Sequence, residues 1–139
     1  MPLYQAALNA LAYAGVGLAI LALGWFALDL ATPGHLGKQI FLHNSASAAV
    51  IAFSAQLGLA AVVATAMWTN GGGLGRGLAW TAAFGVIGVV LQIVGFFVLD
   101  LLTPGKLGAV LTAQGFHPAA LLASGIHLAV AIIICAAIA

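Results

Sequence analysis

Only two carboxylate side chains occur in the 139-residue chain, Asp29 and Asp100, and they occupy matching places in two copies of one segment. The copies run over residues 24–37 and 95–108, and ten of their fourteen aligned positions are identical. Two carboxylates drawn together across a symmetry axis, in apolar surroundings, can bind a metal cation or share a proton. The pair is therefore a candidate ion or proton site.

The same carboxylates also allow a structural interpretation. A negative side chain in the last turn of a helix meets the negative end of the helix dipole, so it needs a compensating partner. Each carboxylate could accept hydrogen bonds from Thr32 or Thr103, or from amides of the following loop, and pair with Lys38 or Lys106. Such contacts would fasten a helical hairpin without any ion, and both interpretations stay open.

Three further polar side chains lie near the middle of long apolar stretches, namely Gln56, Gln92 and His127. Hydrocarbon offers their polar atoms no partner, so we expect them to face the protein interior. One possibility is that they form hydrogen bonds between helices and fix the packing. The other is that they line a narrow hydrophilic path to the level of the carboxylates.

A metal or haem site is not expected. His35, His43 and His117 fall in or near the loops that follow the duplicated segments, but no two histidines stand one helical turn apart. Only His127 is deep enough to be an axial haem ligand, and such a site needs a second residue. No nucleophile or metal constellation indicates an enzyme, and we expect no cofactor.

Composition identifies the chain as an integral membrane protein. Hydrophobic residues make up 65% of it, charged residues only 4%, and the mean hydropathy is +1.25. A net charge of +1 gives no basic surface for nucleic acid, and the single cysteine excludes an internal disulfide. Four apolar stretches reach the roughly 20 residues that a helical span needs. They cover residues 6–31, 41–68, 78–102 and 118–138.

The duplication sets the architecture. A shift of 71 positions superposes the first two stretches on the last two, which predicts hairpin repeats over residues 1–70 and 71–139 within one membrane domain. An even number of spans returns the chain to its starting side, so the repeats have the same orientation. We predict an all-α bundle of four transmembrane helices in two parallel hairpins, with both carboxylates at equal depth.

Pro and Gly mark the ends of the predicted helices. The Thr-Pro-Gly sequences should end the first and third helices, and the glycine-rich residues 69–77 should connect the repeats. Lys38 and Lys106 lie on the Thr-Pro-Gly side and Arg76 on the other, which places the Thr-Pro-Gly loops in the cytoplasm and both termini outside. Three aromatic residues should anchor the opposite interface: Tyr4, Trp68 and Trp80.

Glycines at matching positions indicate close helix packing. Gly17 and Gly24, echoed by Gly88 and Gly95, lie seven residues apart on one face of each odd helix. Each carboxylate follows the second glycine by five positions, which turns it about 140° away from that face. Small residues elsewhere suit contact between copies, so we expect a homo-oligomer in the lipid bilayer.

The duplicated Leu-Asp-Leu-x-Thr-Pro-Gly-x-Leu-Gly segments and the polar residue in the second helix of each repeat resemble the YjfL-like family of small bacterial inner-membrane proteins of unknown function. The resemblance covers nearly the whole chain. It implies a location in the bacterial plasma membrane and a duplicated hairpin. It implies no activity.

These features predict a small channel or transporter component in which Asp29 and Asp100 bind or filter a cation or proton. The alternative is a non-catalytic membrane subunit that anchors or stabilises a larger complex, with other membrane subunits as partners.

Overall fold

The structure, a computed structural model, describes residues 2–31, 36–42, 45–102 and 118–139. The described residues form helices and no strand. The helices are α1 (Leu3–Ala31), α2 (Leu36–Phe41), α3 (Ala46–Thr69), α4 (Leu74–Leu102) and α6 (Pro118–Ile138). All but α2 are long and apolar enough to cross a membrane, which confirms the four predicted spans and implies a lipid environment.

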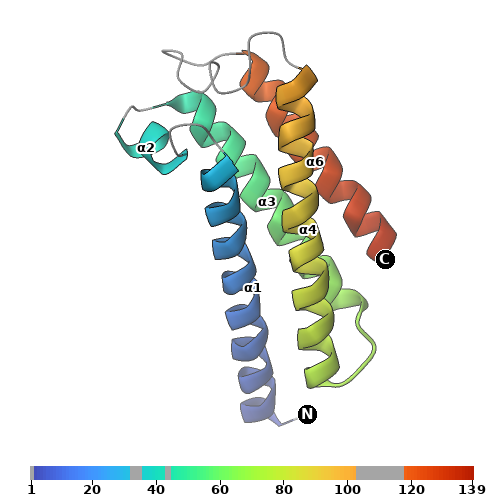
Figure 1. The fold of residues 1–139 in the computed structure, drawn as a ribbon. Coiled ribbons are helices and arrows are strands. Elements are labelled where there is room, and N and C mark those ends of the chain that lie inside the picture. The colour runs from blue at the N-terminus through green and yellow to red at the C-terminus, as the bar shows by residue number, and fades with distance from the viewer. Residues whose placement is uncertain (1, 32–35, 43–44, 103–117) are drawn as a thin grey trace.

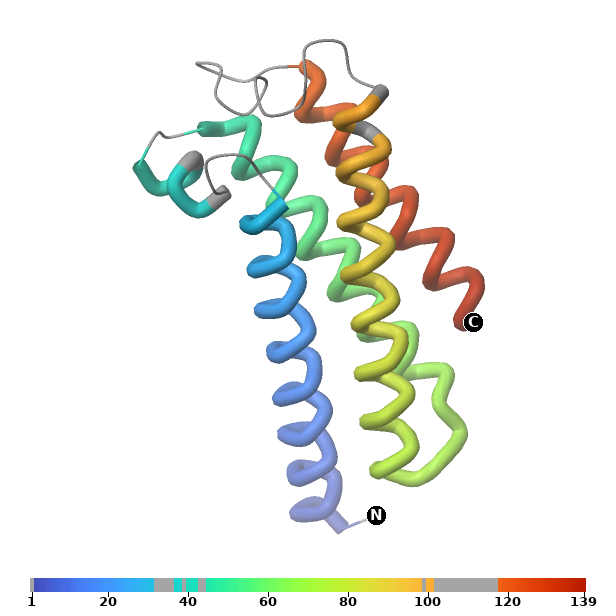
Figure 2. The backbone as a smooth tube through the Cα atoms, viewed as in Figure 1, coloured from blue at the N-terminus to red at the C-terminus, as the bar shows by residue number. Residues whose placement is uncertain are grey.

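The four long helices form one bundle (Figure 1). α1 and α4 run in one direction and α3 and α6 in the other, as parallel hairpins require (Figure 2). α3 and α4 form the centre, because each packs against the other three long helices, while α1 and α6 each pack on α3 and α4. The ends of α1 and α4 that carry the two carboxylates lie at the same end of the bundle.

The second span begins later than hydropathy predicts. The apolar stretch starts at Phe41, but α3 starts at Ala46, and Phe41 instead ends the short helix α2. Ser45 caps α3, since its Oγ accepts a hydrogen bond from the Ala48 amide at 3.1 Å. A serine cap satisfies an amide at the start of a helix, and hydropathy carries no signal for it. α2 packs outside the bundle against α1 and α3.

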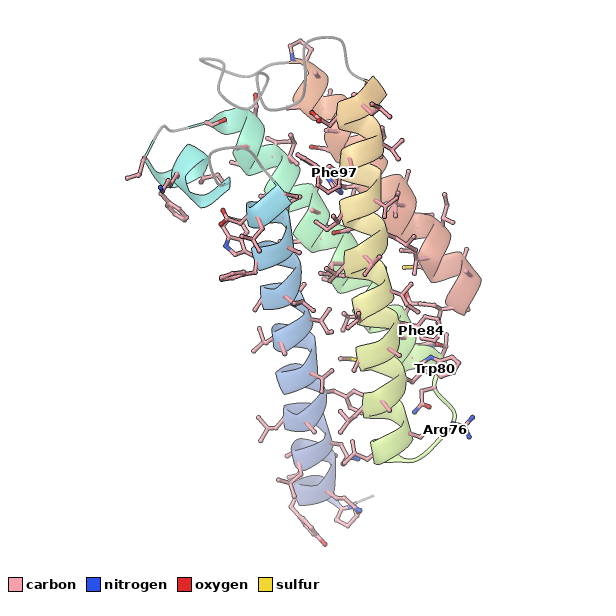
Figure 3. All side chains as sticks on the ribbon, viewed as in Figure 1. Arg76, Trp80, Phe84 and Phe97 are labelled. Carbon is pink, nitrogen blue, oxygen red and sulfur yellow. The ribbon has the colours of Figure 1, made fainter. Side chains whose placement is uncertain are left out.

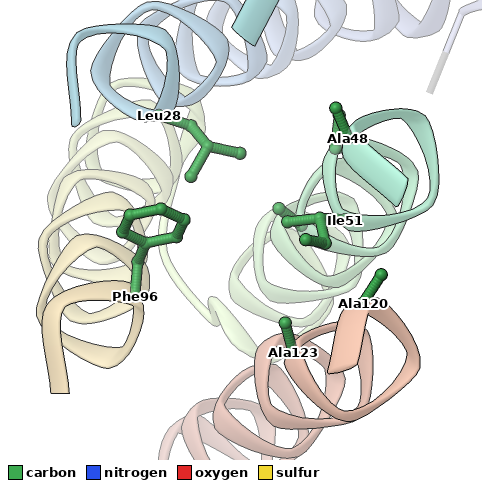
Figure 4. Close-up of a cluster of buried hydrophobic side chains, with 8 residues drawn as sticks. Leu28, Ala48, Ile51, Phe96, Ala120 and Ala123 are labelled. Atoms are coloured by element: carbon green, nitrogen blue, oxygen red, sulfur yellow. The ribbon is translucent and has the colours of Figure 1, made fainter. Parts of the chain in front are cut away.

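Apolar side chains fill the bundle at successive levels. Near the end that carries the carboxylates, all four long helices contribute to one cluster that includes Leu28, Ile51 and Phe96 (Figure 4). Further along the axis, Ile20 and Val89 join α3 residues in a second cluster, and α3 and α6 share a third. Many of the partners are alanines, which let the helices approach closely.

The two hairpins pack alike internally. α1 and α4 each span 29 residues, and both bounds of α4 lie 71 positions after those of α1. Gly24 faces Leu59 within the first hairpin, and the equivalent Gly95 faces Val130, the equivalent of Leu59, within the second. The described residues thus repeat a glycine contact as well as a sequence.

Candidate functional site

Asp29 is directed at α2. The Gly37 amide in the first turn of α2 donates a hydrogen bond to Asp29 Oδ1 at 2.8 Å, and Asp29 is partly buried. The amide end of a helix is electropositive, so this contact offsets the unfavourable position of the carboxylate at the end of α1. It matches the loop-amide contact of the structural interpretation, and it joins the end of the first span to the segment that follows.

Asp100 does not lie level with Asp29. On α1 and α4, Ile20 packs over Gly85, and Gly24 packs against Val89. Residues that lie side by side on these two helices are therefore 65 positions apart in the sequence. This is six fewer than the repeat spacing of 71. At the helical rise of 1.5 Å per residue, six residues place Asp100 about 9 Å further along the bundle axis than Asp29. The two partly buried carboxylates share one end of the bundle, but the equal depth expected from the repeat alone is wrong.

The supporting residues are only partly described. Lys38 lies in α2 and its side chain is exposed. Several predicted residues lie outside the described residues: Thr32, Thr103, Lys106, His35, His43 and His117. Among the residues that the structure does describe, no three metal-binding side chains come together.

The two intramembrane glutamines link helices. Gln56 Nε2 donates to the Leu21 carbonyl of α1 at 3.2 Å, and Gln92 Nε2 donates to the Ala55 carbonyl of α3 at 3.0 Å. Gln92 is buried, whereas Gln56 is partly exposed. Both amides therefore do what the packing interpretation expects, since each ties a neighbouring helix through a backbone oxygen.

His127 is the least satisfied of the three polar side chains. It is 1% exposed and stacks on the Phe96 ring, with ring centroids 6.5 Å apart. Its Nε2 is buried and finds no hydrogen-bond partner within the described parts of the chain. In the repeat, His127 corresponds to Gln56, and Gln92 corresponds to Leu21. In the first hairpin the Gln56 side chain bonds to the Leu21 backbone carbonyl. The second hairpin has a polar side chain at both equivalent positions.

A glycine that the sequence analysis did not single out brings these groups together. A Cβ built on Gly58 would lie 2.8 Å from Ala131 Cβ, 3.3 Å from Gln92 Nε2 and 3.4 Å from the His127 carbonyl oxygen. Gly58 thus allows α3, α4 and α6 to meet at the polar pair of Gln92 and His127. Apolar clusters lie on both sides of this level, so the polar pair is enclosed by packed side chains.

A second polar feature lies at the opposite end, where α3 connects to α4. A cavity of about 340 Å³ is lined there by Thr69, Asn70, Gly71, Gly72, Arg76 and Trp80. From the sequence, this glycine-rich segment was predicted to be a flexible connection and Trp80 to be an interface anchor. The four-residue spacing of Arg76 and Trp80, which puts both on one face of α4, was the signal that could have indicated a site.

Comparison with known proteins supports the membrane assignment. A family model described as Domain of Unknown Function (DUF350) matches residues 2–138. The chain is 33% identical over 137 residues to a UPF0719 transmembrane protein of Mycolicibacterium paratuberculosis, a match that covers 99% of the chain and 91% of the relative. A UPF0719 transmembrane protein of Mycobacterium bovis is 32% identical over 137 residues, with 99% and 90% covered. No solved structure matches. The name YjfL-like stays a resemblance.

Proposed function

We propose, from the premise that the chain belongs to the DUF350 family of transmembrane proteins, that it is a non-catalytic membrane subunit that anchors or stabilises a larger membrane complex. The observation that carries this proposal is the use of the intramembrane polar groups. Gln56 and Gln92 bond to backbone carbonyls of neighbouring helices, and Asp29 bonds to the start of α2. These contacts build a scaffold inside the membrane.

The outer face of α1 supports association as part of this proposal. Only 11% of the α1 span is buried, against 28% to 50% of the other three spans. Gly15, Ala19 and Ala22 are exposed, and their spacing puts them on one helix face, with nothing within 4 Å of a Cβ built on Gly15. Small residues on a lipid-facing helix allow close contact with another helix. Self-association through this face would give the expected homo-oligomer.

Gentle extraction of the tagged protein from its native membrane tests the subunit role. We expect a heterologous membrane protein to copurify in a fixed ratio, and we expect the protein alone to give no cation or proton flux in liposomes. Gly15→Leu should weaken association through α1, whereas Gly125→Leu, at an equally open position on α6, should not. Recovery of the chain alone, together with flux, would reject the proposal.

Cation or proton transport is the second candidate. It is favoured by the buried Nε2 of His127 and by two partly buried carboxylates at one end of the bundle. Ionisable side chains within membrane spans often mark ion or proton pathways. In liposomes, this candidate predicts flux that disappears when Asp29→Asn and Asp100→Asn are combined in a folded protein. Flux that survives the double substitution would exclude the carboxylates as the site.

The proposal also includes a place in the cell. The relatives are bacterial, and we place the protein in the bacterial plasma membrane, with the ends that carry the carboxylates in the cytoplasm and both termini outside. Reporter fusions at the α3–α4 turn and at the C-terminus test this orientation. A reporter that works only outside the cytoplasm should be active at both positions. Activity of a reporter that works only in the cytoplasm would invert the proposed orientation.

A further inference from the structure

Hydrogen bonds and close packing hold the α3–α4 turn that lines the cavity. Asn70 holds the turn through two reciprocal hydrogen bonds: its Nδ2 donates to the Gly72 carbonyl at 3.3 Å, and its Oδ1 accepts from the Gly72 amide at 3.2 Å. A Cβ built on Gly72 would lie 2.6 Å from Arg76 Cδ, so the Arg76 stem packs directly on this glycine. The turn therefore orients the Arg76 side chain.

The charge of Arg76 is not balanced by an acidic side chain of the same chain. The chain has two acidic side chains, and both lie at the far end of α1 and α4, whereas Arg76 is in the first turn of α4. The Arg76 side chain is exposed. A guanidinium group presents a planar fork of donors that matches the oxygens of a phosphate group.

Trp80 and the start of α4 adjoin the same cavity. The indole Nε1 of Trp80 is buried and has no hydrogen-bond partner within the described residues, and Trp80 lines the cavity. Figure 3 shows Arg76 and Trp80 on the side of α4 that faces the connection to α3. The amide end of the 29-residue helix α4 adds a positive dipole end beside them. A guanidinium, an indole N–H and a helix start thus all favour an anion.

The position in the membrane narrows the choice of anion. The turn joins two spans, and Trp68, one residue before the end of α3, is 90% exposed, as is typical of a residue at the lipid interface. We propose that the cavity formed by Asn70, Gly72, Arg76 and Trp80 binds a phosphate group, supplied by a phospholipid headgroup or by free phosphate. Basic pockets between membrane helices bind lipid headgroups in other membrane proteins. The proposal is independent of the subunit role.

Native mass spectrometry of the purified full chain in detergent tests the site, with dioleoylphosphatidylglycerol as the probe. Arg76→Gln should weaken retention of the lipid about tenfold, because a hydrogen bond to a charged group is lost. Lys38→Gln, which removes an exposed cation at the other end, should retain the lipid as the wild type does. Equal retention by Arg76→Gln and the wild type, or equal loss in both variants, would overturn the proposal.

Two variants that keep the charge separate a built site from general attraction. Gly72→Ala must displace the Arg76 stem, and Trp80→Phe removes the indole N–H but keeps a ring beside Phe84, whose centroid lies 4.7 Å from that of Trp80. Both should bind the lipid several-fold more weakly, with unchanged helix content by circular dichroism. Wild-type affinity in both would overturn the site even if Arg76→Gln binds poorly.

A competition arm identifies the source of the phosphate. Inorganic phosphate is added to the lipid-bound wild type, with potassium chloride at matched ionic strength as the control. Displacement by phosphate but not by chloride assigns the site to free phosphate as well as to lipid. Retention of the lipid in both solutions assigns it to the headgroup. Failure of the wild type to bind either probe would overturn the proposal.

Discussion

A carboxylate in the last turn of a helix is electrostatically unfavourable, and Asp29 shows how a neighbouring element removes the problem. Its Oδ1 accepts from the Gly37 amide, which belongs to the electropositive start of α2. The residue thus connects a membrane span to a short helix outside the bundle. One hydrogen bond of this kind to a charged group contributes about 1.5–3 kcal/mol.

Asp29→Ala should therefore release α2 while leaving the bundle intact. We expect amide hydrogen exchange over residues 36–42 to become about tenfold faster, because the lost hydrogen bond involves a charged acceptor. Asp29→Asn keeps an acceptor oxygen and should change exchange far less. Asp100→Ala serves as the control and should leave this segment unchanged. Wild-type exchange in Asp29→Ala would show that the contact does not hold α2.

The imidazole of His127 is polar, but its surroundings are apolar. Its Nε2 is buried and unpartnered within the described residues, whereas Gln92 Nε2 has a partner at 3.0 Å. His127→Leu should therefore raise stability by about 1 kcal/mol, since an unsatisfied buried group is replaced by an apolar one. Gln92→Leu should lower stability by about 0.6–1 kcal/mol.

Reversible unfolding in a mixture of mild detergent and sodium dodecyl sulfate measures both changes. The opposite signs are the distinguishing result. A loss of stability in His127→Leu would mean that the imidazole has a hydrogen-bond partner in the native protein, which would contradict the unpartnered Nε2.

At the scale of elements, glycines decide how closely the helices approach. The glycines of α1 and α4 stand out in the sequence repeat, whereas Gly58 lies alone in α3, where hydropathy gives no periodic signal, and its role was not predicted. Its position between α4 and α6 is decided by the packing of three helices. Gly15 in α1 is the opposite case, because a Cβ there meets nothing within 4 Å.

Gly58→Ala should lower stability by about 1–3 kcal/mol, because the new methyl group would lie 2.8 Å from Ala131 Cβ and force α3 and α6 apart. Gly15→Ala should be neutral or raise stability by up to about 1 kcal/mol through helix propensity. Thermal unfolding followed by circular dichroism compares the two variants. Equal behaviour of the two would contradict the close approach at Gly58.

Hydropathy predicted the membrane spans well and their junctions less well. The third span was predicted to end at residue 102, which is the last helical residue of α4. The fourth predicted span agrees with α6. The start of the second span was wrong by five residues, because the Ser45 cap acts through a single hydrogen bond and not through polarity averaged over a window. α2 was not predicted at all.

At the scale of the whole molecule, the two hairpins are alike inside but shifted against each other. Residues of α1 and α4 that lie side by side differ by six positions from the residues that are equivalent in the repeat. Figure 1 agrees, since α4 reaches beyond α1 at the end that carries the carboxylates. A binding site that needs both carboxylates at one level is therefore not formed by the duplication alone.

Cysteine cross-linking tests this shift. In a Cys135→Ser background, Ile20→Cys with Gly85→Cys should form a disulfide on mild oxidation, because Ile20 side-chain atoms lie within 3 Å of a Cβ built on Gly85. Ile20→Cys with Leu91→Cys joins repeat-equivalent positions, about 9 Å apart along the axis, and should not. The reverse result would restore equal depth of the carboxylates.

The sequence by itself determined that the protein lies in a membrane, that it crosses it four times and that two similar hairpins make the bundle. Hydropathy and duplication are properties of the chain, and no packing is needed to recognise them. The tertiary structure decided where Asp29 points, which carbonyls the glutamines reach, and that His127 Nε2 is enclosed. These outcomes depend on contacts between helices, and the repeats differ in sequence at such positions, as Leu21 and Gln92 or Gln56 and His127 show. The two hairpins therefore have similar backbones, but equivalent residues in them contact different neighbours.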